Sequence, residues 1–142
     1  MLLEQGKSKC TPNQKIIVSK DKGEMREHRA INPKQMYSVR QYQLDGELIK
    51  QQTCCDYLVL NDTLKKAYLI ELKGKRINDA VIQLEAGETK CKEELTDYTF
   101  HYRIVASKTK THDMKSPKFR KFQEKHGNKF KYKTNFLEET LD

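Results

Sequence analysis

The hydrophobic period changes from two to about 3.6 and back to two between residues 66 and 106. Residues 66–73 form a mostly apolar run of the length of a strand, and Gly74 ends the run. Apolar residues then recur at helical spacing, at Ile77, Ala80, Val81, Leu84, Cys91 and Leu95. Residues 99–106 alternate as a strand. A strand, a helix and a strand in this order predict a parallel crossover, which every other element must accommodate.

Further elements are expected on both sides of this crossover. Residues 16–18 are a short candidate strand, and two extended runs over 36–48 flank the turn signal Asp45-Gly46. The apolar run 55–60 is expected to form a hairpin with the strand that precedes Gly74. Ser116-Pro117 is typical of a helix start, and the alternating basic and aromatic residues of 129–133 indicate a last strand.

These elements predict one α/β domain over residues 1–142, with a mixed β-sheet, flanking helices and the order β-β-β-β-α-β-α-β. A single domain is usual for a chain of this length. We expect residues 1–19 to be poorly ordered and the core to cover about residues 20–106. A basic helix-strand extension is expected over residues 107–142.

The charge of the chain is unevenly distributed and favours an anionic partner. The chain contains 28 Lys and Arg against 20 Asp and Glu, a formal net charge of +8. Residues 107–133 carry ten basic and two acidic side chains, whereas residues 41–106 carry nine basic and eleven acidic ones. No apolar run reaches the roughly 20 residues that a membrane helix needs, so no membrane partner is expected.

The start of the chain has no apolar segment typical of a secretory signal, so a cytoplasmic location is expected. In a reducing cytoplasm the four cysteines are expected to be buried free thiols, because two of them are adjacent and no CxxC pair exists. They are Cys10, Cys54, Cys55 and Cys91.

Three polar residues in the predicted hairpin suggest chemistry. Strand alternation places Glu71 and Lys73 on one face, and Asp56 opens the preceding strand of the same hairpin. Two converging carboxylates would suit Mg²⁺ or Mn²⁺, and a nearby ammonium group would orient a water or stabilise phosphate charge. Such a site suits hydrolysis of a phosphodiester. The alternative is a simple ion pair between Glu71 and Lys73.

This pattern resembles the PD-(D/E)XK nuclease superfamily, which includes type II restriction enzymes and archaeal Holliday-junction resolvases. The resemblance rests on Cys55-Asp56, a strand, a turn, Glu71-Leu72-Lys73 and then a helix that contains Gln83. It implies a restriction-endonuclease-like core of order β-β-β-α-β. Cys55 stands where the family usually has proline.

The resemblance also implies roles for individual residues. Asp56, Glu71 and the Leu72 carbonyl would hold the metal, Lys73 would orient the attacking water, and Gln83 would match a glutamine of the family's crossover helix. The family often adds a glutamate from its first helix, for which Glu24 and Glu27 are candidates and Glu27 is preferred.

Nucleic acid is the expected partner, and DNA rather than RNA is implied because most members of the family cut DNA. A homodimer is expected for double-strand cutting. The candidate backbone-binding residues are Lys75, Arg76, Lys118, Arg120 and Lys121. Two alternatives remain open, a non-catalytic nucleic-acid-binding module on the same fold and a protein-interaction domain.

Overall fold

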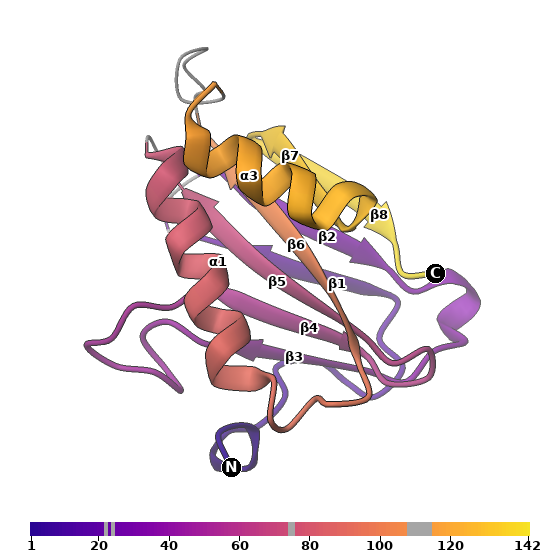
Figure 1. Ribbon diagram of the computed structural model, residues 1–142. Helices are drawn as coiled ribbons and strands as arrows, with labels where there is room; N and C mark the ends of the chain where they lie inside the picture. The colour runs from indigo at the N-terminus through magenta and orange to yellow at the C-terminus, as the bar shows by residue number, and fades with distance from the viewer. Residues whose placement is uncertain (22, 24, 74–75, 108–114) are drawn as a thin grey trace.

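The computed structural model describes residues 1–21, 23, 25–73, 76–107 and 115–142, with the backbone alone at Lys73. Within these residues the chain is an α/β protein with two helices and two mixed sheets (Figure 1). The strands are β1 (Ile16–Lys20), β2 (Glu27–Ile31), β3 (Val39–Gln43), β4 (Tyr57–Asn61), β5 (Lys66–Lys73), β6 (Thr99–Ala106), β7 (Phe130–Thr134) and β8 (Phe136–Thr140). The helices are α1 (Ile77–Cys91) and α3 (Pro117–His126), with short 3₁₀ turns η1 (Leu3–Gln5), η2 (Pro33–Gln35) and η3 (Gly127–Lys129).

The larger sheet has the strand order β3-β4-β5-β6-β7. β3, β4 and β5 form an antiparallel meander, and β6 then pairs parallel to β5 after the crossover through α1. The parallel crossover expected from the change of period is therefore confirmed. A second parallel pair follows, because α3 returns the chain so that β7 lies beside β6.

The larger sheet lies between two other layers. α1 and α3 cover one face, where Leu58, Leu69 and Ile104 contribute to the core beneath them. The three-stranded sheet β1-β2-β8 covers the opposite face, where Ile70 and Leu137 belong to a second core. Within the described residues, neither helix has the length and apolar character that crossing a membrane requires.

Two strands of the smaller sheet, β2 and β8, were not expected from the sequence, and their buried positions explain why. In β2 the inward-facing residues are His28 and Ala30, and in β8 they are Leu137 and the largely buried Glu139. His28 Nε2 lies 2.7 Å from Glu139 Oε2, and Arg103 donates two hydrogen bonds to the same carboxylate, at 2.6 and 2.8 Å. Because polar side chains that pair with each other occupy inward positions, neither strand shows an apolar alternation.

Contrary to the prediction from the sequence, the Asp45-Gly46 turn does not connect two strands of a hairpin. Gly46 does adopt a positive φ of 88°, but no second long strand follows, and β3 pairs directly with β4. The segment 44–55 instead leaves the sheet and folds back toward α1, where Ile49 and Cys54 are buried. One expected hairpin is thus replaced by a loop beside α1, and this loop forms one wall of the cavity described below.

Close packing of α1 on the sheet depends on Gly87. A Cβ atom at this position would lie 2.5 Å from the Sγ atom of Cys55, which is fully buried. All four cysteines are free and buried, as the sequence predicted. The absent side chain therefore lets the helix approach the strand end that carries Asp56.

We predict that Gly87→Ala destabilises the protein by about 1–2 kcal/mol, although alanine favours helices, because overpacking of a filled core costs about 1–3 kcal/mol. Urea unfolding measures the change. The matched control is the Cys55→Ala/Gly87→Ala double variant, in which the clashing sulfur is gone and most of the loss should be recovered. Strictly additive effects of the two substitutions would contradict this account.

Candidate functional site

Asp56 lies where β4 begins and β5 extends beyond it. Its main-chain N–H donates to the Ile70 carbonyl at 3.1 Å, the last backbone hydrogen bond of this strand pair before β5 continues without β4 beside it. The Asp56 side chain then accepts a hydrogen bond from the Leu72 N–H, at 2.8 Å to Oδ2. The carboxylate thus takes the place of the missing strand partner.

The Leu72 carbonyl faces the same gap. In an extended strand the N–H and C=O groups of one residue point to the same side, as shown by antiparallel pairs that exchange both bonds. Because the Leu72 N–H points at Asp56, its carbonyl oxygen also points toward the open end of β4. A carboxylate and a carbonyl therefore border one small space.

Glu71 lies beside Asp56 on the face covered by α1. Its neighbours Ile70 and Leu72 face the smaller sheet, whereas Leu69 belongs to the helix-side core, so alternation puts Glu71 on the helix side. The side chain is buried, with 2% exposed. The approach of Asp56 and Glu71 that the hairpin predicts agrees with this arrangement, because the Glu71 side chain acts to lower the pKa of Asp56.

Burial raises the pKa of Asp56 to about 6. The charges of Asp21 and Asp45 also raise this pKa, whereas the hydrogen bonds from the Leu72 N–H and the Glu71 side chain lower it. A carboxyl group whose pKa is raised binds a proton more readily, and a divalent cation competes with that proton for the carboxylate oxygens.

The donor set fits a hard divalent cation. Asp56, Glu71 and the Leu72 carbonyl offer oxygen ligands, which Mg²⁺ and Mn²⁺ prefer. Among the residues that the structure describes, no group of three or more His, Cys, Asp or Glu side chains is arranged to hold a metal. A cation here would therefore complete its shell with the carbonyl, with water and with substrate oxygens, as Mg²⁺ commonly does.

The structure does not bring Glu27 to this pair. Glu27 begins strand β2 rather than lying on a helix, and its carboxylate accepts two hydrogen bonds from Arg29, at 3.1 and 2.8 Å. It alternates with the inward-facing His28, so it lies on the outer face of the smaller sheet. The choice of Glu27 as a helical site residue was therefore wrong, because β2 has no apolar alternation to mark it as a strand.

Two other acidic residues raise the pKa of Asp56 through their charge. They are Asp21, directly after β1, and Asp45, in the loop that follows β3. Asp21 pairs with Arg26 at 2.6 Å. The Leu44 N–H donates to the Asp56 carbonyl at 2.8 Å, which brings the neighbouring Asp45 to this strand end. Sequence reasoning missed both residues, because their approach depends on how two separate loops return to the strand end.

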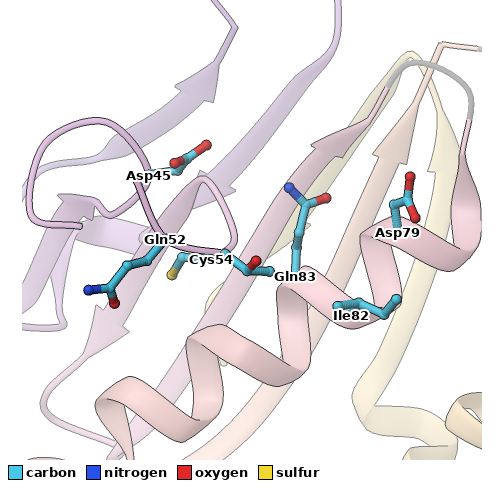
Figure 2. Close-up of a pocket in the computed structure, with 7 residues that line it drawn as sticks. Asp45, Gln52, Cys54, Asp79, Ile82 and Gln83 are labelled. Carbon is cyan, nitrogen blue, oxygen red and sulfur yellow. The ribbon is translucent and has the colours of Figure 1, made fainter. Parts of the chain in front are cut away.

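Gln83 lies on α1 and faces a cavity between this helix and the loop 44–55 (Figure 2). It shares that cavity with Asp79, one helical turn earlier, and with Asp45 on the opposite wall. Gln83 therefore lies on the crossover helix, as the resemblance implies, and neither Asp56 nor Glu71 is among the residues that line this cavity. Glu24 and Lys75 lie outside the described residues, and the Lys73 backbone ends β5 opposite Ala106.

The other predicted phosphate-binding residues lie on the helical layer. Arg76 precedes α1, has a side chain 82% exposed and pairs with Asp79 at 3.7 Å. Lys118 pairs with Glu85 of α1 at 3.4 Å, and Arg120 and Lys121 are exposed on α3.

The start of α3 is joined to the first turn of α1. Ser116 Oγ donates to Asn78 Oδ1 at 2.6 Å and accepts from the Phe119 N–H, as the predicted N-cap of α3. Because α1 begins a few residues after Glu71, the basic start of α3 lies toward the same edge of the sheet (Figure 1).

Comparison with known protein families, with curated proteins and with solved structures finds no match for this chain.

We predict that Asp56→Asn stabilises the metal-free protein above pH 6 but not at pH 4. The pKa of the Asp56 carboxyl is 3.8 in the unfolded chain and about 6 in the folded protein. Ionising it therefore lowers the stability of the fold as the pH rises through this interval. The full cost above pH 6 is about 2–3 kcal/mol. Asparagine avoids the cost and still accepts the hydrogen bond from Leu72.

Urea unfolding of both proteins in a metal chelator, from pH 4 to pH 8, measures this difference. Taking the difference cancels groups common to both proteins, such as His101, whose pKa burial lowers to about 4. Added Mg²⁺ or Mn²⁺ should stabilise the wild-type protein more than the variant. A stability difference that is constant across this range would contradict the assignment.

Proposed function

We propose that this chain is a metal-dependent phosphodiesterase of the PD-(D/E)XK type that cleaves nucleic acid, with DNA as the substrate. The observation that carries the proposal is the pairing of Asp56 with Glu71 at an open strand end, beside the Leu72 amide. The chain order β3-β4-β5-α1-β6 supports it, because the resemblance implies three meandering strands, a crossover helix and a parallel strand.

Each residue then has a distinct task. Asp56 and Glu71, with the Leu72 carbonyl, would hold Mg²⁺ or Mn²⁺, which supplies Lewis-acid polarisation of the scissile phosphate. Lys73 follows Glu71 and Leu72 on β5 and would orient the attacking water. Gln83 would hold that water or a phosphate oxygen from the helix side. The Leu72 N–H keeps Asp56 in place while these groups act.

Basic side chains on the helical layer would hold the backbone of the substrate. Arg76, Lys118, Arg120 and Lys121 project from the start of α1 and from α3, on the same side of the larger sheet as Asp56 and Glu71. Phosphate contacts position a duplex without reading its bases. A homodimer and a cytoplasmic location remain predictions from the sequence.

We predict that the purified protein nicks plasmid or single-stranded DNA when Mg²⁺ or Mn²⁺ is present and not in a chelator. Glu71→Gln and Lys73→Ala should each reduce the cleavage rate by about 100-fold or more, because each removes a charge that acts on the reacting phosphate. Glu138→Gln, a change of the same kind on the exposed β8, is the control and should cleave normally.

Binding of labelled DNA in Ca²⁺ separates catalysis from recognition. Lys73→Ala should bind within a few-fold of the wild-type protein. Tight binding without nicking in any divalent metal would instead support the non-catalytic nucleic-acid-binding module.

We further predict that Arg120→Ala and Lys121→Ala weaken DNA binding and flatten its dependence on salt. Each lost phosphate contact should reduce the slope of log K against log salt by about 0.9 for duplex DNA. Lys15→Ala, at an exposed position before β1, is the matched control and should leave the slope unchanged. Weak binding that does not depend on salt would favour the protein-interaction domain.

A further inference from the structure

The cavity beside Gln83 has a chemistry of its own. It measures about 280 Å³ and lies between α1 and the loop that precedes β4 (Figure 2). Its walls are Asp45, Gln52, Thr53 and Cys54 from the loop, and Asp79, Ile82 and Gln83 from α1. The helix side thus supplies an apolar side chain between two polar ones.

These walls disfavour a phosphate and favour a neutral group that donates hydrogen bonds. Within the described part of the chain, the lining includes two carboxylates and two carboxamides but no lysine or arginine. Asp45 and Asp79 accept hydrogen bonds from amino groups, and the amides of Gln52 and Gln83 both donate and accept. The edges of nucleobases present the same combination of donors and acceptors.

Ile82 adds a surface against which a flat ring can lie. This residue is 43% exposed, whereas the other large apolar residues of α1 are buried. Covering such a side chain with the face of a base removes apolar area from water.

The cavity lies near the strand end that carries the carboxylate pair, although neither carboxylate lines it. Its wall includes Cys54, two residues before Asp56, and Asp45, whose charge raises the pKa of Asp56. A group held here would therefore lie near a phosphate held at Asp56 and Glu71.

We propose that this cavity receives an unpaired nucleobase of the strand whose phosphate binds at Asp56 and Glu71. The inference rests on the proposed function and specifies its substrate, a single-stranded or locally unpaired nucleic acid. A base in a duplex already uses its pairing edge, and extruding it costs a few kcal/mol. A base that is already unpaired enters without that cost.

A neighbouring cavity is suited to the next part of such a strand. It measures about 300 Å³ and shares Gln52 with the first cavity, but it is lined by Lys50 and Lys90 as well as by apolar residues. Lys90 Nζ donates to the Thr53 carbonyl at 3.0 Å, which holds it at the boundary between the two. The first cavity, with its carboxylates and amides, would take a base, and the neighbouring cavity, with its two lysines, would take the phosphate that follows it.

Binding of labelled single-stranded oligonucleotides in Ca²⁺, with one abasic nucleotide moved along the strand, tests the proposal. At one position the missing base should weaken binding by about 5-fold or more, because the contacts that hold the base are lost. Gln52→Ala and Ile82→Ala should abolish this position-specific loss. Ile16→Ala is the matched control, because Ile16 is similarly exposed, at 40%, but lies on the smaller sheet, and it should retain the loss.

The outcomes distinguish this inference from the proposed function. If the oligonucleotide with the abasic position is bound as well as the intact one, and paired and unpaired strands are cleaved equally, the base pocket is wrong and the nuclease stands. If the position-specific loss is present but no substrate is cleaved in any metal, the nuclease is wrong and the pocket stands. If Asp45→Asn abolishes Mn²⁺ binding, and the abasic nucleotide weakens oligonucleotide binding at no position, the cavity holds a cation and the inference is overturned.

Discussion

The unequal lengths of two neighbouring strands determine much of this structure. β5 continues past the point where β4 begins, so the backbone groups of Leu72 would be left without a strand partner. Asp56 satisfies the amide with its side chain and is thereby fixed within reach of Glu71. A buried backbone N–H needs a partner. That requirement of the backbone, met by a carboxylate, places two acidic groups together and leaves a carbonyl oxygen beside them.

The parts of the fold that could be predicted are those whose signal is local. The change of period around Gly74 predicted β5, α1 and β6, and Ser116-Pro117 predicted the start of α3. β2 and β8 could not be predicted, because His28 and Glu139 hold inward positions where an apolar residue would show the strand. Burial acts to raise the pKa of Glu139, yet hydrogen bonds from His28 and Arg103 lower it to about 2.

The candidate site divides in the same way. Asp56 and Glu71 could be paired from the sequence because they belong to one hairpin, whose geometry follows from local spacing. Asp21 and Asp45 could not, because they reach the strand end from two loops whose paths depend on packing. The same loop that carries Asp45 folds against α1 and creates the cavity. The shape of this cavity was therefore absent from the pattern that predicted the carboxylate pair.

The smaller sheet has a consequence for how the protein is made. β2 pairs parallel with β8, and about a hundred residues lie between these two strands, so the contact is among the most distant in the chain. On the ribosome, the β1-β2 hairpin emerges long before its third strand exists. Its inward residues, His28 included, must stay solvated or be shielded until β8 is synthesised. The layer behind the larger sheet therefore closes late, after the strands that carry the carboxylate pair can already have formed.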